Sequence, residues 1–374
     1  METIPNNMSA VQLLGHGGVE KLVLNHQVPV PTIGANDVLI KVGAAGVNNT
    51  DLNTRKAWYS KSYVESAEVK NTEAENIAPK SEPSATNSSD ASWSGEAIEF
   101  PRIQGADVCG IVVAVGEQVD KSLLGRRVLI EPCLQEANDE ALASPWYFGS
   151  ECDGGFAQYT KVAAKHAYPV SSELSDVELA SFPCSYSTAE NMLTRANVSE
   201  RDLVLISGAS GGVGSAAIQL AKARGAKVIA ITSKSKFAEI TAIGADVVLD
   251  RNDDLAKKLG QNSVDVVIDL VAGDQWPQFL QVLKPFGRYA TSGAIAGPIV
   301  ELDVRTLYLK DLSLFGCTIL AKDVFANLIA RIEAKQIKPL IANRFALSEI
   351  AKAQQEFELK KHIGKLVIDL SLKF

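Results

Sequence analysis

The stretch LVLISGASGGVGSAAIQLAK, residues 203–222, decides how this chain is expected to fold. An apolar run of strand length at 203–207 leads into a glycine-rich turn at 208–214, and residues 215–222 have helical composition and spacing. A strand, a glycine turn and a helix in this order form the arrangement in which the first helical turn binds the pyrophosphate of a dinucleotide. The small residues let the backbone approach the phosphates, and Gly214 lets the helix pack closely on its strand.

The turn fits the G-x-G-x-x-G pattern with alanine at the first position and glycine at the other two. A glycine triplet alone is weak evidence, and a purely structural turn is the alternative. Here strand, turn and helix occur in register, which favours nucleotide binding. The cofactor-binding residues predicted from this turn are Ala209, Ser210, Gly211, Gly212, Val213 and Gly214.

The identity of the nucleotide depends on a position about 20 residues further on, where an acidic side chain would bind the adenosine ribose of NAD. The segment AITSKSK at 230–236 has no acidic residue. Its hydroxyl and ammonium groups suit the 2′-phosphate of NADPH, which a carboxylate would repel. We therefore predict NADPH as the cofactor, with Ser233 and Lys234 in its binding site. The alternative is that Lys234 and Lys236 are solvated surface lysines.

The organisation around this turn indicates the fold class. From about residue 174, apolar runs at 202–207, 227–231, 245–249 and 264–269 alternate with stretches of helix length. Such alternation is typical of a parallel sheet covered by helices on both faces. The preceding part consists of short strand-like runs separated by Gly, Pro and Asn. We predict an α/β protein with a β-rich domain and a doubly wound parallel-sheet domain.

The domain boundaries follow from these changes in pattern. We predict a β-rich domain at 1–168 and 317–374 and a dinucleotide-binding domain at 169–316, because a helix near 347–359 and a strand at 365–368 are expected to return to the first domain. Residues 62–94 are polar, with almost nothing apolar to bury, and we interpret them as a flexible surface insertion. A substrate lid or a partner contact is the alternative to a solvated loop.

Composition narrows the function classes. The 374 residues are 46% hydrophobic and 22% charged, as in soluble globular proteins, and the net charge of −7 disfavours nucleic acid as a partner. The chain has no run of the ~18 apolar residues that a membrane span requires, and residues 1–7 lack the features of a signal peptide, so we expect no membrane association and a cytoplasmic location. Five cysteines without a Cys-x-x-Cys pair are interpreted as reduced thiols.

Several motifs together give the chain a resemblance to the medium-chain dehydrogenase/reductase superfamily, and within it to the quinone oxidoreductase branch more than to the zinc alcohol dehydrogenases. The resemblance covers most of the chain and implies a GroES-like catalytic domain, a Rossmann domain and a cleft between them. The segments that carry it, besides the glycine turn, are Gly46–Asp51, Gly105–Gly110, Gly154–Tyr159, Pro183–Ala189 and Gly364–Val367.

The resemblance also indicates what the chain lacks. The zinc-containing relatives take their catalytic ligands from a Cys, a His and a later Cys, and the matching positions here hold Asn48, Ala106 and Cys184. A catalytic zinc site needs about three protein ligands. The lobe with a four-cysteine structural zinc site is also missing, because only Cys133 and Cys152 occur between residues 131 and 159. We therefore expect no metal, with Cys184 as a small residue lining the cleft.

Chemistry without a metal restricts the substrate. Hydride transfer leaves negative charge on a substrate oxygen, and quinones and α,β-unsaturated carbonyls delocalise this charge, so hydrogen-bond donors can suffice. The residues that the resemblance places around the nicotinamide give the predicted catalytic set, Asn48, Thr50, Asp51 and Tyr59.

Thr188 matches a position that packs against the nicotinamide. Asn48 and Asp51 have a structural alternative, because both side chains can hold a local turn. Arg55 is expected either to face a substrate or cofactor phosphate or to form an exposed salt bridge.

These observations together predict an NADPH-dependent reductase of small quinones or enones that works without catalytic zinc. One alternative is an alcohol dehydrogenase-like enzyme or an enoyl-thioester reductase of the same superfamily. Another is a non-enzymatic nucleotide-binding partner protein. The resemblance also implies a homodimer formed through the strand at 312–316.

Overall fold

The computed structural model describes residues 3–60 and 91–372. Most of the predicted insertion at 62–94 lies outside the described residues. Its last part is packed rather than solvated: Ala91 and Ser92 are buried, and the Trp93 N–H donates to Ser150 Oγ at 3.1 Å.

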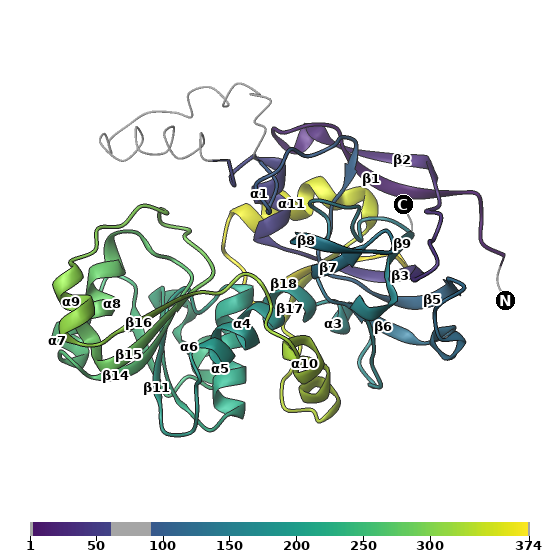
Figure 1. The fold of residues 1–374 in the computed structure, drawn as a ribbon. Coiled ribbons are helices and arrows are strands. Elements are labelled where there is room, and N and C mark those ends of the chain that lie inside the picture. The colour runs from purple at the N-terminus through teal and green to yellow at the C-terminus, as the bar shows by residue number, and fades with distance from the viewer. Residues whose placement is uncertain (1–2, 61–90, 373–374) are drawn as a thin grey trace. The chain divides into compact units, whose positions relative to one another are not determined.

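The chain forms two compact units (Figure 1). Unit 1 comprises residues 1–184, 339–361 and 365–374, and unit 2 comprises residues 185–338 and 362–364. Relative to the boundaries drawn from the sequence, residues 169–184 lie with the N-terminal part and residues 317–338 lie with the dinucleotide-binding part.

Unit 2 contains a sheet of six parallel strands in the order β13-β12-β11-β14-β15-β16. The central strands are apolar runs, because parallel strands covered by helices are buried on both faces. The order reverses direction between β11 and β14, which is the point where ligands bind in open α/β sheets. The strands are β11 (Leu203–Ile206), β12 (Lys227–Thr232), β13 (Val247–Asp250), β14 (Val264–Asp269), β15 (Leu283–Thr291) and β16 (Ser313–Gly316).

Helices flank this sheet (Figure 1), and their apolar faces complete its core. This unit therefore has the Rossmann-like architecture that the alternating pattern predicts. The α-helices are α4 (Pro183–Arg195, whose first two residues count with unit 1), α5 (Gly212–Ala223), α6 (Phe237–Ile243), α7 (Leu255–Leu259), α8 (Trp276–Val282), α9 (Val304–Leu309) and α10 (Val324–Glu333). Short 3-10 turns lie at η4 (Lys234–Lys236) and η5 (Gly273–Gln275).

Unit 1 is β-rich, with one sheet in the order β2-β1-β4 and another in the order β10-β6-β5-β3-β18-β17, where β9 also pairs with β3. The C-terminal strand β18 lies antiparallel to β3, with Leu366 opposite Val47, so the end of the chain completes this sheet (Figure 1). The strands are β1 (Asn7–Leu13), β2 (Leu22–Pro29), β3 (Asp37–Val47), β4 (Arg102–Ile103), β5 (Cys109–Val115), β6 (Arg127–Ile130), β7 (Cys133–Ala137), β8 (Glu140–Tyr147), β9 (Tyr159–Ala163), β10 (Ala167–Pro169), β17 (Ile341–Phe345) and β18 (Lys365–Asp369).

The helices of unit 1 are few and short, and α1 carries part of the site described below. The α-helices are α1 (Asn49–Arg55), α3 (Asp176–Leu179) and α11 (Ile350–Glu358); the 3-10 turns are η1 (Val19–Lys21), η2 (Lys121–Leu123), η3 (Ala164–His166) and η6 (Leu347–Glu349). The helix predicted near 347–359 is confirmed as η6 followed by α11. Helix α10 and the β7–β8 hairpin were not predicted individually.

Candidate active site

The N-terminus of α1 is held by a capping box of Asn48 and Asp51. The Asn48 N–H donates to Asp51 Oδ2 at 2.7 Å, and the Gly105 N–H donates to Asp51 Oδ1 at 3.1 Å. Burial raises the pKa of Asp51 to about 7, against the effect of the Asn48 N–H bond. Asp107 adds to the rise in this pKa and Lys365 opposes it. The structure thus gives Asn48 and Asp51 a structural position; their catalytic roles remain predictions.

The Asn48 side chain belongs to a buried polar cluster with Asp107 and Lys365. Asn48 Nδ2 donates to Asp107 Oδ2 at 2.8 Å and to the Gly46 carbonyl at 3.3 Å, so both amide hydrogens are engaged. Lys365 Nζ donates to Asn48 Oδ1 and forms an ion pair with Asp107 Oδ2 at 2.8 Å. The side chains of Lys365 and Asp107 are 3% and 0% exposed. A buried ion pair requires good geometry and further hydrogen bonds to offset its desolvation, and this cluster supplies both.

Cys184 lies at the edge of this cluster. Its N–H donates to Asp107 Oδ1 at 2.5 Å, and its thiol lies 3.1 Å from the Tyr147 hydroxyl. Burial raises the pKa of the Cys184 thiol to about 12, Asp107 raises it further and Lys365 opposes the rise. The thiol is therefore neutral at physiological pH and a weak nucleophile.

Thr50 and Tyr59 form the second feature of the site. The Tyr59 hydroxyl donates to Thr50 Oγ1 at 3.0 Å. Burial raises the pKa of Tyr59 to about 12, although its hydrogen bonds to Thr50 and Asn53 lower it. The structure thus brings together two of the predicted catalytic residues as a pair of neutral hydroxyl groups.

Arg55 lies inside the fold rather than at a phosphate or on the surface. Its side chain is 1% exposed and its guanidinium donates to the Gly17 carbonyl at 2.7 Å, to Gln354 Oε1 at 2.8 Å and to Glu358 Oε1 at 2.9 Å. These bonds hold α1 against α11. The salt bridge considered from the sequence is present as the ion pair with Glu358, but Arg55 forms it from a buried position rather than on the surface.

A zinc ion does not fit the residues at the three positions used by zinc relatives. Asn48 has its amide oxygen bonded to Lys365, and the side chain of Ala106 has no donor atom, so Cys184 is the one residue of a zinc-ligand type at these three positions. Catalytic zinc takes thiolate, imidazole or carboxylate ligands. Within residues 3–60 and 91–372, no group of three or more His, Cys, Asp or Glu residues is arranged to hold a metal ion. Residues 133–147 form the β7–β8 hairpin.

The glycine turn of unit 2 has the geometry of a phosphate cradle. Gly208 has φ +58°, a left-handed conformation in which glycine makes the tight turn after β11. A Cβ on Gly214 would lie 2.3 Å from the Gly208 carbonyl oxygen and 2.7 Å from Ala209 Cα, so only glycine permits this close packing. A Cβ on Gly211 would meet only the Gly208 carbonyl oxygen, at 3.5 Å. The first N–H groups of α5 have no acceptor within the helix and are available to an anion.

The lysines after β12 differ in their surroundings. Lys234 is exposed, whereas Lys236 is partly buried and reaches the glycine turn, with Nζ 3.3 Å from Ser210 Oγ and 3.1 Å from the His362 carbonyl. Burial lowers the pKa of Lys236. Ser233 Oγ lies 3.2 Å from Ser235 Oγ. The residue that reaches the cradle is thus Lys236, which the sequence could not distinguish from Lys234.

Sequence reasoning missed Asp269, at the carboxyl end of β14. This fully buried carboxylate accepts hydrogen bonds from the Ser207 hydroxyl, from Tyr289 OH at 2.5 Å and from the Val271 N–H at 2.9 Å. It therefore links β11 and β14 at the point where the strand order reverses and orders the loop beside Gly208. An acidic residue at the carboxyl end of a mainly apolar strand was the available signal. Thr188, the last predicted cofactor residue, lies partly buried on α4 of the same unit.

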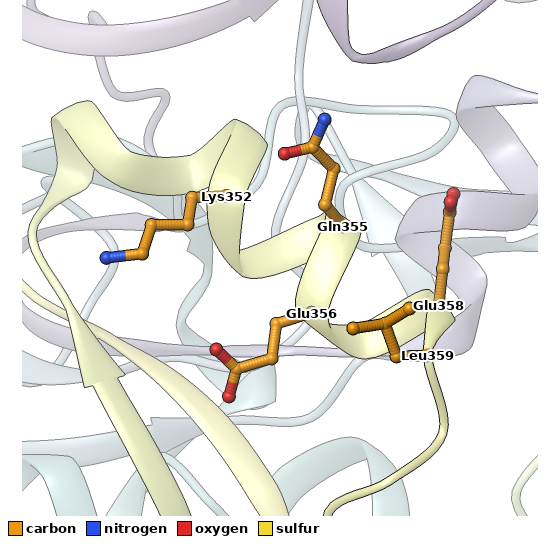
Figure 2. A pocket seen from close by; sticks show the side chains of 5 residues that line it. All are labelled: Lys352, Gln355, Glu356, Glu358 and Leu359. Carbon is orange, nitrogen blue, oxygen red and sulfur yellow. The ribbon is translucent and has the colours of Figure 1, made fainter.

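The outer face of α11 carries a separate hollow, open to solvent and about 530 Å³ in volume. Figure 2 shows the side chains that line it, Lys352, Gln355, Glu356, Glu358 and Leu359. None of them is a predicted site residue, and Glu358 is paired with Arg55 and Lys56. Among the described residues, no helix is long and apolar enough to cross a membrane.

Comparisons with known proteins agree with this architecture. The family model described as alcohol dehydrogenase GroES-like domain matches residues 76–172, and the one described as zinc-binding dehydrogenase matches residues 212–334. The chain is 29% identical to a quinone oxidoreductase of Sus scrofa, covering 98% of this chain and 99% of the relative. It is 28% identical to an NADPH-dependent alkenal/one oxidoreductase, chloroplastic, of Arabidopsis thaliana, covering 98% and 80%.

Among solved structures, a putative alcohol dehydrogenase from Sinorhizobium meliloti 1021 matches with a TM-score of 0.83 and 43% identity, covering 98% of this chain and 97% of that one. The fold and the glycine cradle, with these matches, define an oxidoreductase. The chain belongs to the medium-chain dehydrogenase/reductase superfamily and is quinone oxidoreductase-like. The resemblance drawn from the sequence is confirmed.

Proposed function

We propose that this protein is an NADPH-dependent oxidoreductase that reduces quinones or α,β-unsaturated carbonyl compounds without a catalytic metal. The observation that carries the proposal is the Thr50–Tyr59 hydroxyl pair, in a unit where the residues at the zinc-ligand positions do not fit zinc. The relatives named for quinone and alkenal/one reduction span nearly the whole chain and support the same substrate class.

The hydroxyl pair supplies what a conjugated substrate needs. When bound, the reduced nicotinamide would supply a hydride; the negative charge left on the substrate oxygen then needs a hydrogen-bond donor, and water supplies the proton that completes the reduction. Because Tyr59 OH donates to Thr50 Oγ1, Thr50 keeps its own hydroxyl hydrogen for another acceptor, and we assign that acceptor to the substrate oxygen. The pKa of Tyr59, raised by burial to about 12, keeps its proton in place and Thr50 oriented as a donor. Asn48 and Asp51 then act by positioning α1.

The cofactor assignment rests on the segment after β12. Lys236 Nζ lies beside the glycine turn, the segment from residue 230 to residue 236 has no carboxylate, and Ser233 and Lys234 add a hydroxyl and a second ammonium. A charge-assisted hydrogen bond contributes roughly 1.5–3 kcal/mol, which corresponds to about a 10–150-fold change in affinity. We therefore expect Lys236→Ala to raise the KM for NADPH at least tenfold while changing the KM for NADH little.

Lys234→Ala is the matched comparison for this test. Lys234 lies in the same 3-10 turn, two residues before Lys236, and its side chain is exposed. If Lys234→Ala weakens NADPH binding and Lys236→Ala does not, the assignment of Lys236 is wrong.

The activity is tested by following NADPH oxidation with a quinone, an enone, an enoyl thioester and a plain ketone, each with and without a chelator. We expect turnover of the quinone or the enone that chelation leaves unchanged. Thr50→Val should lower kcat about 10²-fold or more, as loss of one hydrogen-bond donor to a developing oxyanion does, and Tyr59→Phe should lower it less. Activity confined to the ketone and abolished by the chelator would contradict the proposal, and turnover of the enoyl thioester alone would assign the alternative substrate class.

We also propose a homodimer formed through β16. This strand ends the parallel sheet, and large apolar side chains are exposed on and near it: Leu314 is 38% exposed, Leu309 72% and Phe286 74%. An exposed edge strand with apolar neighbours is a common site of pairing between identical chains.

A further inference from the structure

The buried cluster around Asp107 has the donor types that usually surround a cation. It contains the carboxylate of Asp107, fully buried, the carboxyl group of Asp51, 2% exposed, and the thiol of Cys184, 8% exposed. An unpaired carboxylate in such a place costs several kcal/mol, so a positive charge must accompany it. The positive charge in this cluster is the ammonium of Lys365, which lies 2.8 Å from Asp107 Oδ2.

Local structure explains how a lysine reaches the inside of the unit. Lys365 is the first residue of β18, and its neighbour Leu366 lies opposite Val47 at the end of β3. The antiparallel register therefore brings Lys365 next to Asn48, the residue that follows Val47. Its backbone N–H donates to the Leu340 carbonyl at 2.8 Å, which fixes the start of the strand. The side chain is then enclosed, and its Nζ bonds Asn48 Oδ1 and Asp107 Oδ2.

These bonds join three segments of the chain. The matching segments of the zinc-containing relatives supply the metal ligands. Asn48 stands at the first ligand position, Asp107 follows the second position at Ala106, and Asp107 Oδ1 accepts the N–H of Cys184 at the third. Lys365 and Asp107 thus connect the end of β3, the segment before β5 and the start of α4.

We propose that the Lys365 ammonium is the built-in cation of this cluster, which cross-links the three segments and bars a divalent ion from the site. Two effects exclude the ion. The ammonium occupies the Asn48 oxygen and one Asp107 oxygen, and at short range in a buried site its charge strongly repels a second cation. The inference goes beyond the proposed reaction, because it concerns what holds the site together, and it predicts metal exclusion even where ligands are supplied.

A graft of zinc ligands tests the exclusion. Asn48→Cys and Ala106→His, combined with the native Cys184, supply the three ligand types of the zinc relatives. We expect the double variant to take up little Zn²⁺ and the triple variant that also carries Lys365→Met to hold about one Zn²⁺ per chain. The matched control is the double variant with Lys352→Met, since Lys352 extends from the outer face of α11 (Figure 2) and is 66% exposed. Metal content after gel filtration and competition with a chromogenic chelator are the readouts.

Two results would overturn the proposal. One is a double variant that binds Zn²⁺ as tightly as the variant with Lys365→Met. The other is a folded triple variant, by circular dichroism, that takes up no Zn²⁺.

A second measurement covers the case in which the grafted variants do not fold. Lys365→Ala in the native background removes the ammonium and leaves space beside Asp107. We expect a lower thermal midpoint than that of the unmodified protein, and partial recovery on adding ethylammonium chloride but not tetramethylammonium chloride, which has no N–H donors. The unmodified protein and Lys352→Ala should respond equally to the two salts. No recovery with ethylammonium, or equal recovery with both salts, would show that a hydrogen-bonding cation is not what this cluster requires. Neither readout depends on enzyme activity, so failure here is distinct from failure of the proposed function.

Discussion

The titration of Asp51 gives the most direct test of how this site is built. Burial raises the pKa of Asp51 from 3.8 to about 7, with Asp107 adding to the rise and Lys365 and the Asn48 and Gly105 N–H groups opposing it. The perturbation is a change of pH, compared between the unmodified protein and Asp51→Asn, which carries no titrating proton at this position.

The sign follows from proton linkage. Between pH 4 and 7 the folded state binds more protons at Asp51 than the unfolded state, so the stability that this group contributes falls as the pH rises. That contribution is fully present below the unfolded pKa and is lost by the folded pKa. At 1.36 kcal/mol per unit, the contribution falls by about 3 kcal/mol between pH 5 and pH 8.

The assay is urea unfolding followed by tryptophan fluorescence at pH 5, 6, 7 and 8 for both proteins. We expect the unfolding free energy of the unmodified protein minus that of Asp51→Asn to fall by about 3 kcal/mol over this range and to level off above about pH 7. Hydrogen bonds that Asn cannot reproduce lower the stability of the variant equally at all pH values and cancel in this slope. A difference that stays constant, or that rises with pH, would refute the conclusion that burial dominates the ionisation of Asp51.

Three further predictions concern other parts of the molecule. Gly214→Ala should prevent stable folding of unit 2 or lower its unfolding free energy by several kcal/mol, because the added Cβ would lie 2.3 Å from a backbone oxygen. Gly211→Ala should keep the thermal midpoint of the unmodified protein and lose nucleotide affinity in a fluorescence titration. Equal midpoints for the two variants would contradict the packing argument. Cys184 should react slowly with a thiol reagent in the folded protein, since burial raises its pKa to about 12, and rapidly in urea; fast native labelling assigned by mass spectrometry would refute this. Leu314→Lys should convert a dimer into a monomer in light scattering, and an unmodified protein that is already monomeric would remove the proposed β16 interface.

The glycine turn shows how far sequence reasoning reaches. Strand, turn and helix are consecutive, so their order and the need for small residues can be read directly from residues 203–222. The residue that makes the tight turn could not be read from the sequence. The pattern placed Ala209 at the first position, but Gly208 adopts the left-handed conformation. Lys234 and Lys236 are equivalent in the sequence, and only the path of the 3-10 turn places one beside Ser210 and exposes the other.

The sequence alone determined the alternating strands and helices of unit 2, the β-rich composition of unit 1 and membership of the family. It also showed that two of the positions matching zinc ligands hold Asn48 and Ala106, because all of these features depend on local composition or short motifs. Only the tertiary structure decided the surroundings of Asn48, Asp107 and Lys365, which are far apart in sequence and meet because β18 pairs with β3. The tertiary structure also buries the side chain of Arg55 and raises the pKa of Asp51. The ionisation state of a side chain and its hydrogen-bond partners depend on burial and on residues that are distant in sequence. The residues next to it in the chain do not determine either one.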